Sequence, residues 1–157
     1  MVLYDNLCNS KASVVHRLET IVGQPLTFIQ GDVRDTAKLE TILRQHQIEA
    51  VIHFAGLKAV GESVQKPLAY FDANIIGTLS LLKAMESAGV ERLVFSSSAT
   101  VYGAPQYLPL DEEHATSATN PYGRSKLHIE ELLADVAKAN ERLRVVCLRY
   151  FNPVGAQ

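Results

Sequence analysis

Tyr122 and Lys126 are the two residues of this sequence whose types and spacing most clearly suggest chemistry. On a helix, residues four positions apart lie on the same face, one turn from each other. A nearby lysine ammonium favours the ionised form of a phenol, and the phenolate is the form that acts as a base. The pair therefore predicts a general base that removes a proton from a substrate hydroxyl while a hydride passes to a nicotinamide.

Ser98 is the third candidate, because a serine hydroxyl could hold the substrate oxygen while the proton leaves. It follows a short segment that begins at Arg92 and is mostly apolar, which predicts a strand. Asn120 and Pro121 predict a helix start, with asparagine as the cap and proline in the first turn. Strand ends and helix starts are where open parallel sheets place their ligands. Without this setting, the tyrosine–lysine pair would fit an ordinary exposed helix face equally well.

The elements that must position these residues alternate along the chain. Short apolar runs predict buried strands at residues 1–4, 26–29, 50–54, 92–95 and 144–150. Apolar residues keep helical spacing at 14–22 and 39–43, and longer helices are expected over 67–87, ended by Gly89, and over 121–140. Strict alternation predicts a parallel sheet covered on both faces. The fold class is therefore α/β, doubly wound and Rossmann-like.

Small or polar residues follow three of the predicted strands. Asp5 could accept hydrogen bonds from the ribose hydroxyls of adenosine, and Asp32 could accept one from an adenine amino group. The run Phe54-Ala55-Gly56 would let a cofactor approach the backbone, and Lys58 could meet a phosphate. Each has a simpler interpretation, as a turn, a cap or a solvated lysine. Together, at successive strand ends, they indicate a dinucleotide site.

Asp5 lacks the segment that normally precedes such an acid. A dinucleotide site needs a strand and a Gly-x-Gly-x-x-Gly turn about 20 residues upstream, and none of the nine glycines falls in that spacing. We therefore expect residues 1–157 to form a partial NAD-binding Rossmann domain, truncated so that its first strand, turn and helix are missing. That strand is central in the order 3-2-1-4-5-6, so both its neighbours would have unpaired edges. The chain alone is then expected to bind NAD weakly and to turn over no substrate.

Composition excludes several classes of protein. The length suits one domain, and 47% hydrophobic residues suffice for a core. A net charge of −2 without a basic cluster argues against a nucleic-acid partner, and no apolar run is long enough to span a membrane. Cys8 and Cys147 are unpatterned, which predicts a reduced, cytoplasmic protein. The five histidines show no metal-ligand spacing, so no metal is expected.

Five segments of the sequence resemble the UDP-glucose 4-epimerases, a group within the extended short-chain dehydrogenase/reductase family. They are residues 5–10, 53–67, 95–103, 121–126 and 149–156. The resemblance covers essentially the whole chain and corresponds to the middle of such an enzyme. It implies that most of the carboxyl-terminal sugar-nucleotide domain is absent.

The resemblance also implies a role for individual residues. Tyr122 would take the proton from the sugar 4-hydroxyl, and Lys126 would also bind the nicotinamide ribose. Ser98, Tyr122 and Asn152 would contact the sugar nucleotide. The NAD-binding residues that it implies are Asp5, Asn6, Leu7, Cys8, Asn9, Ser10, Asp32, Val33, Phe54, Ala55, Gly56, Leu57, Lys58, Asn74, Ser96, Tyr122, Lys126, Tyr150 and Phe151.

One position departs from the family pattern. Relatives often carry two asparagines where this chain has Ala73 followed by Asn74. This substitution removes one amide near the cofactor and leaves Asn74 as the expected contact.

The implied reaction interconverts UDP-glucose and UDP-galactose through a 4-keto sugar, in galactose metabolism. Related 4,6-dehydratases carry an Asp-Glu pair where this chain has Ala99 and Thr100, which argues against dehydration. Two alternatives stay open, a 4-epimerase of another nucleotide sugar and a non-catalytic remnant or partial binding module. The expected small-molecule partner is a UDP-sugar. Family members are often homodimers through helices like those at 67–87 and 121–140, so a homodimer is also expected.

Overall fold

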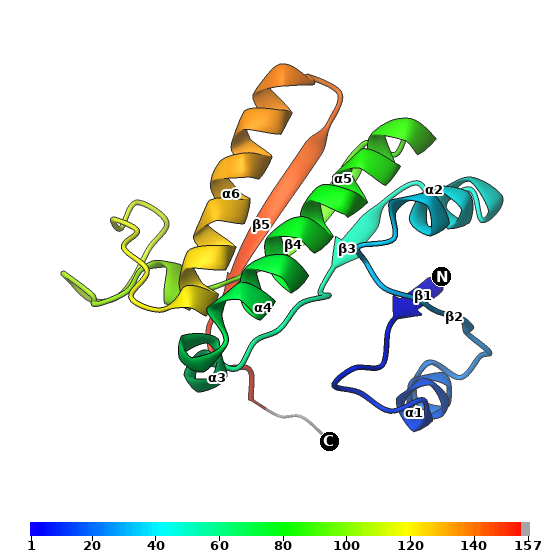
Figure 1. Ribbon diagram of the computed structural model, residues 1–157, viewed down its shortest axis with the longest axis horizontal. Coiled ribbons are helices and arrows are strands. Elements are labelled where there is room, and N and C mark those ends of the chain that lie inside the picture. The colour runs from blue at the N-terminus through cyan, green and yellow to red at the C-terminus, as the bar shows by residue number, and fades with distance from the viewer. Residues whose placement is uncertain (155–157) are drawn as a thin grey trace.

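A computed structural model of the chain describes residues 1–154 (Figure 1). Strands and helices alternate as predicted. Their bounds are β1 (Val2–Asp5), α1 (Ser13–Val22), β2 (Thr27–Gln30), α2 (Thr36–Gln45), β3 (Val51–His53), α3 (Val60–Gln65), α4 (Pro67–Phe71), η1 (Asp72–Ile76), α5 (Gly77–Ala88), β4 (Arg92–Ser98), η2 (Ala99–Val101), α6 (Pro121–Ala139) and β5 (Arg144–Tyr150). All five predicted strands are confirmed.

The strands form two parallel sheets, one of β1 and β2 and one in the order β3-β4-β5. In the second sheet His53 is in register with Phe95, and Ser98 with Tyr150. Because the strands within each sheet are parallel, their carboxyl ends share one edge. β1 and β3 do not pair with each other, as the predicted strand order with an empty central place requires. Each of them therefore has one edge without a strand partner in the described part of the chain.

The helix predicted over 67–87 has a more complex structure. It begins at Pro67 and ends at Gly89, which adopts the left-handed conformation with φ 74°, but its middle is the π-helical turn η1. Such turns are rare and frequently occur at functional sites. The π turn contains Asn74, a buried residue whose side chain is bonded to segments outside the helix.

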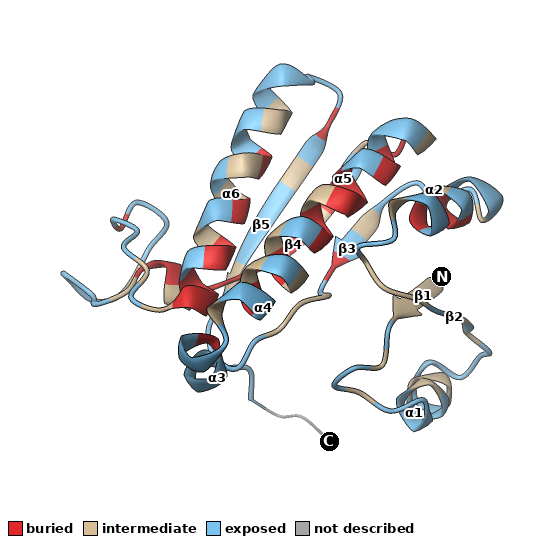
Figure 2. Ribbon diagram, in the orientation of Figure 1, coloured by how far each residue is buried: buried red, intermediate tan, exposed pale blue. Residues whose placement is uncertain are grey.

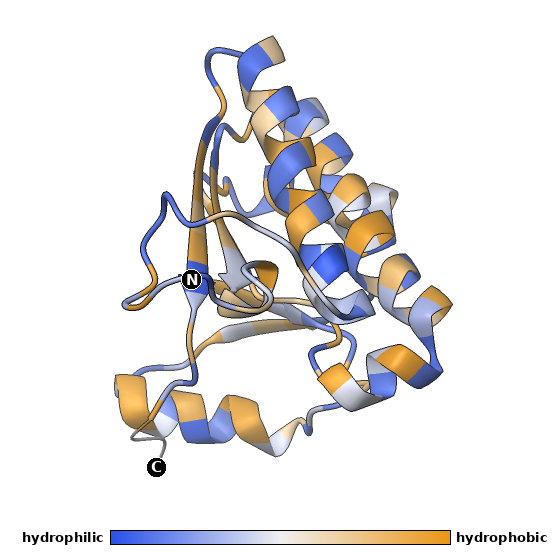
Figure 3. Cartoon of the chain, turned by 90° about the vertical axis from the view of Figure 1, so that its left-hand side faces the viewer, coloured by the Kyte–Doolittle hydropathy of each residue, from blue (hydrophilic) through white to orange (hydrophobic). Residues whose placement is uncertain are grey.

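Helices pack on one face of the larger sheet. The core cluster joins α2, α5 and α6 to the strands, with Phe95, Met85 and Ile129 almost fully buried (Figure 2). Figure 3 shows this helix layer on one side of the strands. Ile52 and Val146 are exposed on the other face of the sheet.

The predicted α/β fold with parallel strands is confirmed, and the helices that cover the β3-β4-β5 sheet lie on one of its faces. Right-handed crossovers that advance in one direction across a sheet put their helices on the same face. The connections β2 to β3, β3 to β4 and β4 to β5 all advance in this way. Only the connection from β1 to β2 runs in the opposite direction, and its helix α1 lies apart from the helix layer (Figure 1).

Candidate active site

The first turn of α6 carries the predicted base. Asn120 caps the helix, since its Oδ1 accepts a 2.8 Å hydrogen bond from the Gly123 N–H, and Pro121 occupies the first turn. This confirms the predicted helix start. Tyr122 and Lys126 lie one turn apart and are both buried, and the Lys126 Nζ is 5.9 Å from the centre of the Tyr122 ring. The cation thus lies close to the phenol ring, as the spacing predicted.

The amine of Lys126 is fixed by the neighbouring strand. Its Nζ donates a 2.8 Å hydrogen bond to the Ser96 carbonyl and lies 4.7 Å from the centre of the Phe95 ring. Burial disfavours the ammonium and lowers the pKa of Lys126 from 10.5 to about 8. Lys126 is therefore held in place between β4 and the Tyr122 ring. Ser96, a predicted cofactor residue, uses its carbonyl here to position that amine.

Ser98 is the last residue of β4 and is 9% exposed. Its Oγ accepts hydrogen bonds from the Thr100 N–H at 3.2 Å and from the Thr100 Oγ1 at 3.0 Å. With both bonds accepted, the Ser98 hydroxyl proton is available to donate to a ligand oxygen. The turn also packs on α6, because a Cβ added at Gly123 would lie only 2.9 Å from the Thr100 carbonyl oxygen. The structure thus brings residues 98–101, the serine turn, against the start of the helix that carries Tyr122.

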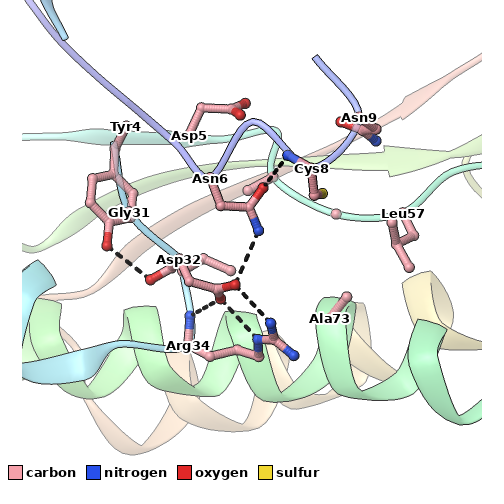
Figure 4. A pocket seen from close by; sticks show the side chains of 13 residues that line it. Tyr4, Asp5, Asn6, Cys8, Asn9, Gly31, Asp32, Arg34, Leu57 and Ala73 are labelled. Atoms are coloured by element: carbon pink, nitrogen blue, oxygen red, sulfur yellow. Dashed lines mark hydrogen bonds and ion pairs between the residues drawn. The ribbon is translucent and has the colours of Figure 1, made fainter. Parts of the chain in front are cut away.

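A second site lies where β1, β2 and β3 end (Figure 4). The pocket there brings together residues from all three strand ends and from η1. Its lining includes nine predicted cofactor residues, namely Asp5, Asn6, Cys8, Asn9, Asp32, Val33, Ala55, Gly56 and Leu57. It also includes four that the sequence did not single out, namely Tyr4, Gly31, Arg34 and Ala73. Adjacency to Asp5 and Asp32 was the only signal for Tyr4, Gly31 and Arg34. Ala73 was noted only as a departure from the family pattern.

Asp5 organises the loop after β1. Its Oδ1 accepts hydrogen bonds from the Leu7 N–H at 2.6 Å and the Ser10 Oγ at 3.0 Å. Leu7 has a positive φ of 59°, which this turn stabilises. The alternative interpretation of Asp5 as a turn residue is therefore correct, and it is compatible with a ligand at the remaining carboxylate oxygen. Leu7 and Ser10 do not line the pocket themselves.

The carboxylate of Asp32 is bonded to the Arg34 guanidinium through two hydrogen bonds, Nε to Oδ1 at 2.8 Å and Nη2 to Oδ2 at 2.7 Å, and to the Arg34 backbone N–H at 3.0 Å (Figure 4). The Asn6 Nδ2 also donates to the Asp32 carboxylate at 3.0 Å, and Arg34 also contacts Asp72 of η1. The Arg34 guanidinium holds the pKa of Asp32 well below its usual range. Asp32 is therefore ionised and engaged with protein groups. Its predicted contact with adenine stays a prediction.

Asn74 links the loop after β3 to α6. Its Oδ1 accepts from the Leu57 N–H at 2.8 Å, and its Nδ2 donates to the Leu57 carbonyl at 3.1 Å and to the Ser125 Oγ at 2.9 Å. Gly56 has a φ of 152°, and a Cβ there would lie 2.8 Å from the Asn74 Oδ1. The buried amide thus shapes the loop that was predicted to border the cofactor. A direct contact between Asn74 and NAD stays a prediction.

The other predicted residues lie at exposed positions near these two sites. Phe54 and Lys58 flank the loop after β3, and Phe151 and Asn152 follow β5. Tyr150 is half-exposed and is in register with Ser98, so the end of β5 lies beside the serine turn. Residues 155 and 156 of the resembling segment fall outside the described residues.

Two absences are observed within residues 1–154. No group of three or more histidine, cysteine or acidic side chains is arranged to hold a metal ion. No helix in that range has the length and apolar character needed to cross a membrane.

Comparison with known proteins places this chain in a family. The family model described as the NAD dependent epimerase/dehydratase family matches residues 2–157. The UDP-glucose 4-epimerase of Pasteurella multocida (strain Pm70) is 52% identical over 157 residues, which is 99% of this chain and 46% of that protein. The chain thus spans just under half the length of the curated relatives that it matches.

Two solved structures are similar in fold and sequence. The UDP-glucose 4-epimerase of Bifidobacterium longum in complex with NAD+ and UDP has a TM-score of 0.96 and 52% identity, over 99% of this chain and 47% of that one. The UDP-glucose-4-epimerase of Stenotrophomonas maltophila with bound NAD and formylated UDP-arabinopyranose has a TM-score of 0.96 and 54% identity, over 99% and 46%. Fold, sequence and site geometry agree, and this chain belongs to the NAD dependent epimerase/dehydratase family.

Proposed function

We propose that this chain carries the cofactor and proton-transfer site of an NAD-dependent UDP-glucose 4-epimerase, an isomerase that interconverts UDP-glucose and UDP-galactose. The observation that carries the proposal is the placement of the Lys126 amine, held on the Ser96 carbonyl and 5.9 Å from the Tyr122 ring centre. Ser98 is the last residue of β4, the strand whose Ser96 carbonyl accepts the hydrogen bond from Lys126. Curated relatives of this chain are named UDP-glucose 4-epimerase, which supports the proposal.

In this mechanism Tyr122 removes the proton from the sugar 4-hydroxyl and later returns it. Lys126 stabilises the tyrosine in its ionised form through its positive charge. Ser98 donates its free hydroxyl proton to the sugar oxygen and so holds carbon 4 in place. A bound NAD would supply the hydride chemistry, in which a hydride leaves carbon 4 of the sugar and returns to its other face. Because the hydride returns, the net reaction is isomerisation through a 4-keto sugar.

The residues present fit an NAD molecule. The lining of the pocket at the ends of β1 to β3 supports this cofactor, because it includes the carboxylate of Asp5, which could accept from a ribose, and the small residues Ala55 and Gly56, which would leave the backbone open to close approach. Two structures of relatives contain NAD or NAD+. We assign the adenosine half of NAD to this pocket, and its nicotinamide half to the region of Lys126, Tyr150 and Phe151.

Several further assignments belong to the same proposal. The substrate is a UDP-hexose, and a 4-epimerase of another nucleotide sugar is the alternative within this class. Residues 1–157 form part of the NAD-binding domain. The intact enzyme is a cytoplasmic homodimer that binds no nucleic acid.

One observation favours a different class, a non-catalytic remnant or binding module. β1 and β3 each have a strand edge without a partner in the described residues, and such edges lose backbone hydrogen bonds and promote aggregation. A chain in this state would bind NAD weakly.

Two experiments separate these functions. In the first, the purified chain is assayed with NAD and UDP-galactose for formation of UDP-glucose, with Tyr122→Phe as the matched variant. Turnover that Tyr122→Phe abolishes supports the epimerase, and no turnover favours the remnant.

The second experiment tests the site apart from the length of the chain. Residues 1–157 replace the matching segment of the Pasteurella multocida enzyme. A chimera whose activity requires Tyr122, Lys126 and Ser98 supports the proposed site. An inactive but folded chimera contradicts it.

A further inference from the structure

A partly buried ion pair joins α6 to β5 next to the candidate active site. The Glu130 Oε2 accepts hydrogen bonds from the Arg149 Nη2 at 2.7 Å and from the Arg149 Nε at 3.1 Å, and the Nε also donates to Oε1 at 3.2 Å, so the pair is bidentate. The side chains are only 10% and 23% exposed, respectively. The Ser97 hydroxyl donates to the other oxygen of the same carboxylate. None of the roles proposed above uses these three residues.

The positions of these residues connect three elements at the level of the site. Ser97 and Arg149 are directly opposite each other in the β4–β5 register. Glu130 lies on α6, four residues after Lys126 and thus on the same helix face. One carboxylate therefore receives hydrogen bonds from two neighbouring strands, one turn of helix away from the amine of Lys126.

The arginine also supports the turn after Ser98. Its guanidinium carbon lies 4.9 Å from the centre of the Tyr102 ring, and Tyr102 directly follows η2. Tyr102 is buried, and its ring packs edge-on against the His114 ring at 5.5 Å. Arg149 thus contacts both the helix that carries Tyr122 and the segment that follows Ser98.

A buried ion pair is weak evidence for stability, because removing two charges from water costs about as much as their attraction returns. Its best-attested use is to fix one register between packed elements. A bidentate carboxylate–guanidinium pair is suited to this use, since its planar geometry permits little sliding or rotation.

We propose that Glu130 and Arg149 are positioning residues that fix α6 against β4 and β5 and so hold Lys126 on the Ser96 carbonyl. The catalytic meaning of this placement rests on the proposed epimerase function. The placement itself does not, and it can be measured without cofactor or sugar.

The experiment measures how strongly the structure protects the amine of Lys126. The folded chain is treated briefly with an acetylating reagent, and the rate of modification of each lysine is read by mass spectrometry. Lys138 is the internal reference, because it lies on the same helix and is exposed. The principal variant is the double replacement of Glu130→Leu and Arg149→Met, which removes both charges and leaves no buried ion unpaired.

Two further variants complete the design. Arg149→Lys keeps the charge but loses the bidentate geometry. Leu133→Ala removes a buried core contact from α6 without touching the pair, so it reports what general loosening of the helix does.

In the double variant we expect the rate at Lys126, relative to Lys138, to rise about tenfold or more, while the melting temperature stays close to that of the wild type. Arg149→Lys should show a smaller rise, and Leu133→Ala should lower the melting temperature without this selective rise. If the double variant does not fold, Arg149→Lys decides the question. Unchanged protection of Lys126 in the folded variants, or an equal rise in Leu133→Ala, overturns the proposal.

The result is distinct from that of the epimerase test. The selective exposure of Lys126 can be measured whether or not the chain has epimerase activity. In the active chimera, the same double variant should lower kcat much more than it changes KM for the sugar nucleotide.

Discussion

The ammonium of Lys126 and the carbonyl of Ser96, 30 residues apart in sequence, are joined by a 2.8 Å hydrogen bond in the carboxyl-terminal half of β4. This bond fixes the amine beside the Tyr122 ring and buries it almost completely. The arrangement is costly for a charged group, because burial lowers the pKa of Lys126 to about 8. Such costs are typical of functional sites, where charge placement outweighs stability.

The buried amine predicts a pH-dependent difference in stability between the wild type and Lys126→Met. Below pH 8 the folded and unfolded states both hold the proton, so the wild type bears the full cost of burying the ammonium. Between pH 8 and 10.5 only the unfolded state keeps the proton. The free energy of unfolding of the wild type, relative to the variant, should therefore rise with pH by about 3 kcal/mol in total.

Urea unfolding of both proteins at pH 7, 8, 9 and 10 would measure this difference. Taking the difference cancels Cys147 and Tyr4, whose burial raises their pKa values to about 11 and about 12. A difference that does not vary with pH would show that Lys126 is not desolvated in the folded chain.

Replacing Asn74 with alanine should lower the free energy of unfolding by about 3 kcal/mol, because it removes the side-chain partner of the Leu57 N–H and of the Leu57 carbonyl and one of the two hydrogen bonds of the Ser125 hydroxyl. Chemical denaturation measures this cost. Asn9→Ala, at an exposed position, is the control and should change stability by less than about 0.5 kcal/mol. Similar costs for both variants would contradict the assigned role of Asn74.

Two glycines with nearly equal φ angles allow a matched test of the turn after Tyr102. Gly23 has a φ of 73° with no atom within 4 Å of an added Cβ, whereas Gly103 has a φ of 68° and the Ser117 carbonyl oxygen 1.9 Å from that position. Gly23→Ala should cost about 1 kcal/mol for the left-handed backbone alone. Gly103→Ala should cost at least about 2 kcal/mol more, because the clash is with backbone. Thermal unfolding of the two variants compares these costs, and equal values would exclude the close approach of Ser117.

The carboxylate of Asp5 predicts a preference for NADH over NADPH, because a 2′-phosphate beside it would be repelled. Asp5→Asn keeps an oxygen that can accept from Leu7 and Ser10 but removes the charge. The variant should bind NADH about tenfold more weakly and should discriminate less against NADPH. Fluorescence titration of the reduced cofactors measures both affinities. Unchanged affinities would show that the ribose does not bind at Asp5.

The sequence by itself determined the elements and their class, because periodicity and caps are local signals. The strand at 92–95, the capped start of α6 at Asn120 and the end of α5 at Gly89 all followed from neighbouring residues. The sequence also predicted that β1 and β3 would not pair with each other, because another strand lies between them in the order 3-2-1-4-5-6. The tyrosine–lysine spacing predicted that the two residues share a helix face.

Only the tertiary structure decided which side chains form hydrogen bonds and ion pairs with residues that are distant in sequence. The bond between Asn74 and Leu57, the bridge from Arg34 to Asp72 and the pair of Glu130 with Arg149 all join segments that are distant in sequence. No local pattern specifies such pairs, because they arise when crossovers bring helices onto the sheet. The π turn at Asn74 also depends on the tertiary structure. The Asn74 side chain is bonded to Leu57 and Ser125, which lie outside its own helix, so helix propensity cannot predict the turn.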